Sequence, residues 1–249
     1  MRDVLGWRAK FGVMGPSTNT VVQPDFDMLR PPGVTAHYSR IFTPDAHAVS
    51  NESFRAGAEL IGANTMDAVR SVMTCGPDRL VMGMSAVTFF DGAAGADRFQ
   101  QAVEKESGLK VTIGSHACTA ALRALDPGIR RISVLSPYWP SMNSEVAHYF
   151  TDMGFTVVRD RALQCRRWTA IAEVTEAQLV PVLRELDGEE VDAIVQVGTN
   201  LSMVRLAAEA ERWLGKPVLA INAATWWHAL REHGIPDKVP GFGRLLAEH

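Results

Sequence analysis

Short apolar runs alternate with longer amphipathic stretches along the whole chain. A short apolar run bounded by turn-forming residues is typical of a strand in a parallel sheet, and apolar residues spaced three and four apart are typical of a helix. The pattern predicts strands at Lys10–Met14, Val34–Arg40, Arg79–Gly83, Val111–Ile113, Ile132–Leu135, Thr156–Asp160, Ala193–Val197 and Val218–Ile221. It predicts helices at Gln23–Leu29, Asn51–Met73, Gly95–Ser107, Ser115–Leu125, Ser141–Met153, Thr175–Glu185, Met203–Leu214 and Ala224–His233. The alternation favours βαβ units and an α/β fold.

Three segments of the first half recur in the same order in the second half. FGVMGPSTNTVV parallels ISVLSPYWPSMNSEV, since each has a β-run, a proline, and then hydroxyl residues and an asparagine that open a helix. PDRLVMGMSAVTF parallels VDAIVQVGTNLSMV, and GLKVTIGSHACTAALRAL parallels GKPVLAINAATWWHALREHG. We therefore expect two similar Rossmann-like lobes of about 110 residues, each with a parallel sheet, related by a pseudo-twofold axis. The predicted division is 1–115 plus 223–249 for the first lobe and 116–222 for the second.

The repeat also predicts where a ligand binds. Ligands of open parallel sheets lie beyond the carboxyl ends of the strands, so two facing lobes enclose one site in the cleft between them. The helices that follow the strands favour an anion there, because their first amides and their positive dipole ends point into the cleft. We expect a small carboxylate as the ligand. The strand-end segments are Pro16–Asn19, Met84–Ser85, Ser115–His116, Pro137–Tyr138, Gly198–Asn200 and Asn222.

Some of these residues are equally compatible with structural roles. Ser17 and Thr18 are good helix caps, and a tyrosine beside a proline, such as Tyr138, often serves packing. Thr199 and Asn200 follow Gly198 at a strand end, where a turn requires such residues.

Composition and charge argue against several classes of partner. The chain has 25 Lys and Arg against 28 Asp and Glu, a net charge of −3, and no basic run, which is atypical of proteins that bind nucleic acid. Its apolar runs are far shorter than the roughly 20 residues of a membrane-spanning helix. The N-terminal MRDVLGWRAK lacks the apolar segment of a secretory signal. We expect a cytoplasmic protein that binds neither nucleic acid nor membrane, and self-association is left open.

The sequence gives no signal for a metal or a cofactor. Cys75, Cys118 and Cys165 are widely spaced and odd in number, which argues against a disulfide framework and against a structural zinc site. No GxGxxG or GxxxxGK[ST] run occurs, and the seven histidines lack paired metal-ligand spacing. We therefore predict neither cofactor nor metal.

Several segments resemble the aspartate/glutamate racemase superfamily, and within it the branch of maleate cis–trans isomerases and arylmalonate decarboxylase. They are GPSTNT, MGMSAVTFFDGAAGA, WWHALREHGI and PGFGRLLAEH, and the similarity extends over nearly the whole chain. The resemblance implies a cofactor-independent isomerase or decarboxylase that acts at the carbon next to a carboxylate of a small mono- or dicarboxylate. It implies Tyr138 and Ser85 as catalytic residues. The substrate-binding residues that it implies are Pro16, Ser17, Asn19, Met84, Gly198, Thr199 and Asn200.

In that superfamily, two cysteines at equivalent strand ends face each other across the cleft as proton donor, proton acceptor or nucleophile, and decarboxylases keep one of them. Alignment from Asp78 and Asp192 places these positions at Met84 and Gly198, or at Gly83 after a shift by one residue. The resemblance therefore implies non-standard, cysteine-less catalytic positions, since a thioether or a hydrogen neither carries a proton nor attacks an alkene. Decarboxylation tolerates this loss best, because the enediolate forms before a proton from water or Tyr138 is needed.

Other groups are candidates to replace the missing thiols. Cys165 lies in ALQCRRW, where Arg166 and Arg167 would lower its pKa and pair with a second carboxylate. His116 is a candidate acid or base at the mouth of the cleft. Two alternative functions stay open: a catalytically inactive paralogue that binds a carboxylate, and a hydrolase or lyase that uses Cys165.

Overall fold

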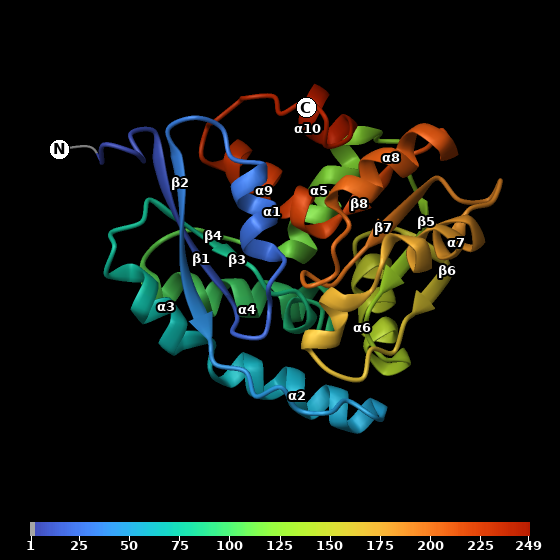
Figure 1. Ribbon diagram of the computed structural model, residues 1–249, viewed down its shortest axis with the longest axis horizontal. Coiled ribbons are helices and arrows are strands. Elements are labelled where there is room, and N and C mark those ends of the chain that lie inside the picture. The colour runs from blue at the N-terminus through green and yellow to red at the C-terminus, as the bar shows by residue number, and fades with distance from the viewer. Residues whose placement is uncertain (1–2) are drawn as a thin grey trace.

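Two parallel β-sheets of four strands form the framework of the protein, in a computed structural model that describes residues 3–249. The first sheet has the order β2-β1-β3-β4, and the second has the equivalent order β6-β5-β7-β8 (Figure 1). All eight strands predicted from the sequence are present, and the shared order is the arrangement that the repeat predicts. The strands are β1 (Ala9–Pro16), β2 (Val34–Ile41), β3 (Arg79–Met82), β4 (Val111–Thr112), β5 (Arg131–Ser136), β6 (Thr156–Ala162), β7 (Ala193–Gln196) and β8 (Val218–Ala220).

One central strand of each sheet is buried along its whole length. Every residue of β3 and of β7 is buried, as expected where helices cover both faces of a parallel sheet. The connecting helices are α1 (Val22–Met28), α2 (Asn51–Ala63), α3 (Thr65–Met73), α4 (Gly92–Ser107), α5 (Gly114–Leu125), α6 (Pro140–Asp152), α7 (Glu176–Leu186), α8 (Val204–Leu214), α9 (Ile221–Glu232) and α10 (Arg244–Glu248).

The single helix predicted over Asn51–Met73 is wrong. The chain breaks at Asn64, which ends α2 and precedes α3 with φ −85° and ψ −1°. Asn64 donates its side-chain amide to the carbonyl of Phe42, 2.9 Å away, so a tertiary contact fixes the break. Two short 3-10 helices, η1 (Ala86–Thr88) and η2 (Thr169–Glu173), and the terminal α10 were also not predicted.

The two halves of the chain meet where equivalent helices cross. Helix α5 follows β4 of the first sheet, α9 follows β8 of the second, and the two helices pack against each other. Their N-terminal ends approach closely, because a β-carbon on Gly114 would lie 2.8 Å from Cδ1 of Ile221. The lobe division at residues 115–116 and 222–223 stays a prediction.

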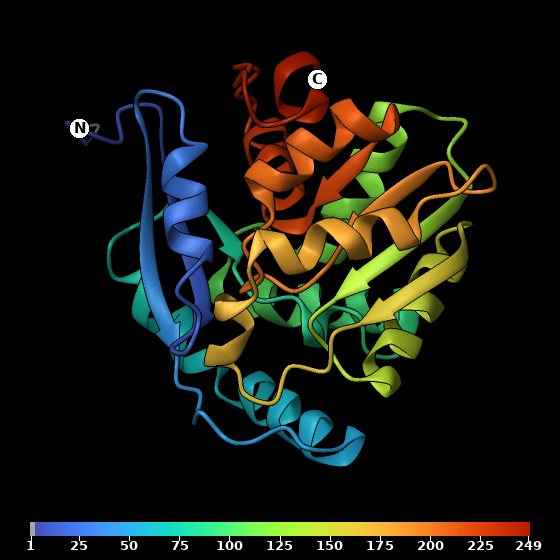
Figure 2. The ribbon, with the colours of Figure 1, turned by 45° about the vertical axis from the view of Figure 1, so that its right-hand side comes forward.

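Helix α2 extends from the first sheet toward the helices of the second. It lies along the lower edge of the molecule in both ribbon views (Figure 2). The backbone amide of Ser141 donates to Oδ1 of Asn51 at 3.0 Å, and Arg55 forms an ion pair with Glu145 at 3.1 Å. The helix is therefore bound at one end to α6.

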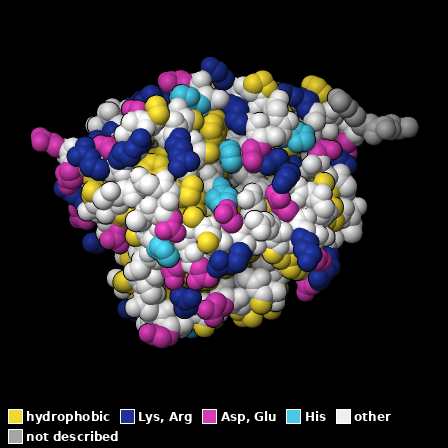
Figure 3. All heavy atoms as spheres, turned by 180° about the vertical axis from the view of Figure 1, so that it is seen from behind, with side chains coloured by type: hydrophobic (Ala, Val, Ile, Leu, Met, Phe, Trp, Pro, Cys, Tyr) yellow, Lys and Arg dark blue, Asp and Glu magenta, His cyan; other side chains and the backbone are white. Residues whose placement is uncertain are grey.

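The surface carries charges of both signs. On the face shown in Figure 3, basic and acidic side chains are interspersed. Within residues 3–249, no helix combines the length and the apolar character needed to cross a bilayer. In the same part of the chain, no three His, Cys, Asp or Glu side chains gather in a way that would hold a metal ion.

Candidate functional site

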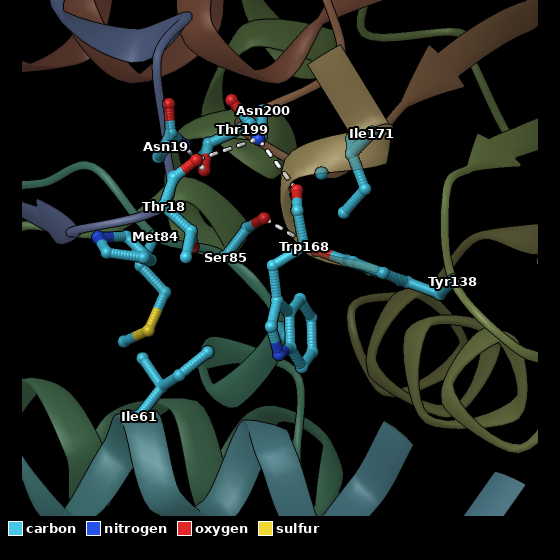
Figure 4. Close-up of a pocket in the computed structure, with 13 residues that line it drawn as sticks. Thr18, Asn19, Ile61, Met84, Ser85, Tyr138, Trp168, Ile171, Thr199 and Asn200 are labelled. Atoms are coloured by element: carbon cyan, nitrogen blue, oxygen red, sulfur yellow. Dashed lines mark hydrogen bonds between the residues drawn. The ribbon is translucent and has the colours of Figure 1, made fainter. Parts of the chain in front are cut away.

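A cavity of about 40 Å³ lies where the carboxyl ends of strands from both sheets meet. Known small-molecule sites are roughly 300–1,000 Å³, so this cavity is small for a substrate of more than a few atoms. The lining residues come from the ends of β1, β3, β5 and β7 and from α2, η1 and η2 (Figure 4). They are Pro16, Thr18, Asn19, Ile61, Met84, Ser85, Ala86, Tyr138, Trp168, Ile171, Gly198, Thr199 and Asn200.

Most of the residues expected at the site are brought together here. Pro16, Asn19, Met84, Ser85, Tyr138, Gly198, Thr199 and Asn200 all line the cavity, whereas Ser17 and Cys165 do not. Ser17 is bound to a neighbouring loop instead: its Oγ accepts from the backbone amide of Thr43 at 2.9 Å and donates to the Thr43 carbonyl at 3.3 Å. The substrate-binding role expected for Ser17 is therefore not supported by the geometry.

Asn19 joins the end of β1 to the end of β7. Its Oδ1 accepts from the backbone amides of Val21 and Val22, both at 3.0 Å, and so satisfies the N-terminus of α1. Its Nδ2 donates to Oγ1 of Thr199 at 3.0 Å. The structural alternative that Ser17 or Thr18 caps this helix is wrong, because Asn19 does so. The same side chain thus fixes a helix start and a contact between the two sheets.

Thr199 and Asn200 carry further links across the cleft. Thr199 donates its hydroxyl to the carbonyl of Gly83 at 3.1 Å, and Asn200 donates its side-chain amide to the carbonyl of Trp168 at 2.9 Å. The backbone amides of Ser85, Thr199 and Asn200 make no hydrogen bond to another of residues 3–249. Buried amides normally have partners, so these N–H groups are available as hydrogen-bond donors.

Ser85 and Tyr138 form a buried hydroxyl pair. Their oxygens lie 2.7 Å apart, and the two residues are 2% and 3% exposed. Burial raises the pKa of the Tyr138 phenol far above its usual range, and the hydrogen bond from Ser85 only partly offsets this. Tyr138 therefore keeps its proton at neutral pH and can act as a donor.

The cavity has a polar side and an apolar side and carries no formal charge. Figure 4 shows Asn19, Thr199 and Asn200 grouped at one side, with Ile61 and Met84 at the other. None of the 13 residues drawn there is Lys, Arg, His, Asp or Glu. A carboxylate in this cavity would be held by neutral donors alone, without a counter-ion.

Gly198 has a backbone that only glycine adopts easily. Its φ is +98°, and a β-carbon at this position would lie 2.4 Å from Cδ and 2.5 Å from Cγ of Pro137. These distances are far below van der Waals contact. A side chain at position 198 would therefore strain the backbone and collide with the proline ring.

The geometry does not support the reactive thiol expected at Cys165, which stays a prediction. Cys165 is half-buried, and burial raises its pKa to about 11. Arg167 is not placed to lower the pKa of the thiol, because its Nε donates to Asp45 at 3.0 Å. The backbone amide and the hydroxyl of Thr169 also donate to Asp45, at 3.2 and 2.9 Å. These contacts, which we call the Asp45 clasp, bind the loop that carries Trp168 to the segment that follows β2.

His116 is also remote from the cavity lining. Its Nδ1 lies 3.1 Å from Oε1 of Gln100, and its Nε2 lies 3.2 Å from Asp97. Burial lowers its pKa, with Asp97 opposing the shift. Cys118 is fully buried, and burial strongly raises the pKa of its thiol, so it is a core residue.

Sequence reasoning missed the apolar lining of the cavity. Ile61 comes from α2, Trp168 and Ile171 come from the loop around η2, and Ala86 begins η1. None of these residues follows a strand end immediately, except Ala86 beside Ser85. The signal for Trp168 in the sequence was a large apolar side chain within the loop ALQCRRWTAI, and the structure shows that this side chain is 8% exposed.

Comparison with known proteins gives consistent matches over most of the chain. The family described as arylmalonate decarboxylase matches residues 31–246. Maleate isomerase of Nocardia farcinica is 28% identical over 249 residues, with 96% of each chain covered. Arylmalonate decarboxylase of Bordetella bronchiseptica is 28% identical over 195 residues, which covers 77% of this chain and 80% of that protein.

Solved structures agree with the fold. A serine-for-cysteine variant of N. farcinica maleate cis–trans isomerase, with a covalently bound succinylcysteine intermediate, superposes with a TM-score of 0.86 at 27% identity and covers 97% of this chain and 99% of that one. A liganded arylmalonate decarboxylase, in which one glycine is replaced by cysteine and one cysteine by serine, gives a TM-score of 0.81 at 25% identity and covers 97% and 100%. The expected α/β architecture of two parallel sheets is thus confirmed.

Proposed function

Since the chain belongs to the arylmalonate decarboxylase family, we propose that it decarboxylates, without a cofactor, a small malonate-type acid that bears an apolar substituent. The observation that carries the proposal is the division of an uncharged cavity into a side of neutral hydrogen-bond donors and a side of apolar side chains. Malonates have two carboxylates on one carbon. Each side of the cavity suits one of them.

The polar side would hold the carboxylate that remains in the product. Its donors are the Ser85–Tyr138 hydroxyl pair and the backbone amides of Ser85, Thr199 and Asn200. When the carbon–carbon bond breaks, its electron pair moves toward this retained carboxylate and gives an enediolate. Preorganised donors stabilise that developing charge more than they stabilise the substrate, which lowers the barrier.

The apolar side would hold the carboxylate that leaves as carbon dioxide. Ile61, Met84 and Ile171 offer it no counter-ion and no hydrogen bond to replace its water. An ionised carboxylate is destabilised against such a surface, whereas neutral carbon dioxide is not. The apolar lining therefore favours loss of the group.

The enediolate then needs one proton at the carbon that lost its carboxyl group. Tyr138 holds a proton at neutral pH and lies in the cavity beside Ser85. Met84 and Gly198 have no ionisable group to deliver one. Tyr138, reprotonated by solvent, completes the cycle: one carbon–carbon bond breaks, one carbon–hydrogen bond forms, and carbon dioxide is released.

The test is turnover of phenylmalonate and of alkylmalonates, followed by ¹³C NMR in deuterated water. We expect carbon dioxide and a product with one deuterium at the α-carbon. Tyr138→Phe should lower turnover about 100-fold or more, because a positioned proton donor contributes roughly 10²–10⁴-fold. Tyr149→Phe is the matched control, since Tyr149 is also a buried phenol paired with a hydroxyl, that of Thr119 at 3.2 Å, and does not line the cavity.

Two results would contradict the proposal. No release of carbon dioxide from any malonate, with binding still measured by calorimetry, would favour a catalytically inactive carboxylate-binding paralogue. Equal turnover in the wild type and in Tyr138→Phe would remove the tyrosine from the reaction.

A further inference from the structure

A buried carboxylate lies behind the cavity and is joined to it through one amide. Asn222, in the first turn of α9, donates its Nδ2 to the backbone carbonyl of Thr199 at 2.9 Å. The same nitrogen donates its other hydrogen to Oδ2 of Asp25, on α1, at 2.8 Å. Asp25 and Asn222 are 7% and 2% exposed, and neither lines the cavity. Asn222 thus links Asp25 to a residue that does line it.

Thr199 is the residue at which the strand ends are joined. Its hydroxyl binds Gly83 after β3 and Asn19 after β1, at 3.1 and 3.0 Å. Its backbone carbonyl is held by Asn222 alone within residues 3–249. The orientation of the Asn222 amide therefore helps to place the peptide that carries the neighbouring donor, the amide of Asn200.

The Asn222 amide has an unsatisfied atom in this orientation. Its Oδ1 is buried and has no hydrogen-bond partner among the described residues. Leaving a buried acceptor unpaired is costly, so the contacts of the nitrogen must select this orientation against the flipped one. An ionised Asp25 and the Thr199 carbonyl do so together, because both accept hydrogen bonds and donate none.

We propose that Asp25 is a positioning residue which, through Asn222, sets the placement of Thr199 and of the donors at the end of β7. When Asp25 is ionised, both hydrogens of the Asn222 amide are engaged and the Thr199 carbonyl is held. When Asp25 is protonated, its hydroxyl becomes a donor, and the amide turns to present Oδ1 to it. That turn removes the hydrogen bond to Thr199.

The change of state falls within the range of ordinary pH. Burial raises the pKa of Asp25 to about 6, while the hydrogen bond from Asn222 and the charge of Arg205 on α8 oppose the shift. Tyr38 on β2 is another ionisable group that interacts with Asp25. Burial raises the pKa of the Tyr38 phenol above its usual range, so Tyr38 stays neutral. The site is therefore expected to change its arrangement between about pH 5 and pH 7.

The experiment is an NMR titration of the intact protein without ligand, from pH 4.5 to 8. We expect the backbone amide of Thr199 and the side-chain amide of Asn222 to shift with a common midpoint near pH 6 in the wild type. Asp25→Asn should abolish both transitions. Asp27→Asn is the matched control, because Asp27 lies on the same helix with its side chain 45% exposed, and it should leave both transitions unchanged.

Asn222→Ala tests whether Asp25 acts on Thr199 through Asn222. In this variant the carboxyl carbon of Asp25 should still titrate, while the amide of Thr199 should no longer follow it. A Thr199 resonance that does not move between pH 5 and 7 in the wild type, or that still moves in Asp25→Asn, would overturn the proposal. The wild-type titration alone can do so, whether or not a variant folds.

The consequence for catalysis rests on the proposed function. The pH profile of kcat/KM for phenylmalonate should fall below about pH 6 in the wild type and lose that limb in Asp25→Asn. A limb that persists in this variant would contradict the positioning role. Absence of any turnover would refute the decarboxylase but would leave the NMR titration to decide the role of Asp25.

Discussion

Replacing Gly198 with cysteine would place a thiol at the end of β7, and the structure predicts that the protein will not accept it. The backbone at Gly198 has φ +98°, which costs a residue with a side chain about 1–3 kcal/mol. A β-carbon there would lie 2.4 Å from Cδ of Pro137, and forcing such a contact costs typically 1–3 kcal/mol more. Together, the two effects should lower the free energy of unfolding of Gly198→Cys by about 2–6 kcal/mol, which is a large part of the roughly 5–15 kcal/mol of most proteins.

The assay is urea unfolding followed by circular dichroism, with Gly154→Cys as the matched control. Gly154 has a similar φ of +87°, but a β-carbon there would meet no atom within 4 Å. The control therefore isolates backbone strain, and Gly198→Cys should lose about 1–3 kcal/mol more than it does. Equal losses in the two variants would refute the collision with Pro137. Gly198→Cys should also fail to convert maleate to fumarate.

Three further predictions follow from the same geometry. Because the folded pKa of Asp25, about 6, lies above the ordinary 3.8, its ionisation destabilises the fold as pH rises from about 4 to 6. The free energy of unfolding of Asp25→Asn in urea should therefore rise relative to that of the wild type, by up to about 3 kcal/mol over that pH range. A difference that is independent of pH would contradict this. Asp45→Ala, which removes the partner of Arg167 and Thr169, should change the urea midpoint little, because the ion pair is partly exposed, yet should speed ligand entry in stopped-flow fluorescence. Trp168→Ala should cost about 3–5 kcal/mol and admit bulkier malonates, and an unchanged substrate range would show that Trp168 does not limit the cavity.

The strand ends were predictable from the sequence because they depend on local pattern and on the repeat. A buried strand followed by a proline or glycine and then by hydroxyl residues identifies a carboxyl end of a parallel sheet, and the repeat pairs one such end with its equivalent. Met84 and Gly198, Ser85 and Tyr138 were found in this way, and all four line the cavity. Ser17 follows the same pattern but is bound by Thr43 on another loop, a contact that no local pattern encodes.

The apolar cover of the cavity was not predictable, because it depends on contacts between distant segments. Ile61 reaches the site only because α2 ends at Ala63 and is bound to α6 at its other end. Trp168 is placed by Asn200 and by the Asp45 clasp, whose partners are more than a hundred residues apart in sequence. The role of Asp25 was hidden for the same reason, since a single buried acid in a short helix gives no sequence signal.

The contact between Pro137 and Gly198 also bears on how such a site changes over evolutionary time. The proline ring occupies the space that a side chain at position 198 would need. A single substitution that introduces a thiol at position 198 is therefore disfavoured unless position 137 changes first or together with it. The two positions are thus expected to be epistatic: the effect of a side chain at position 198 depends on which residue stands at position 137.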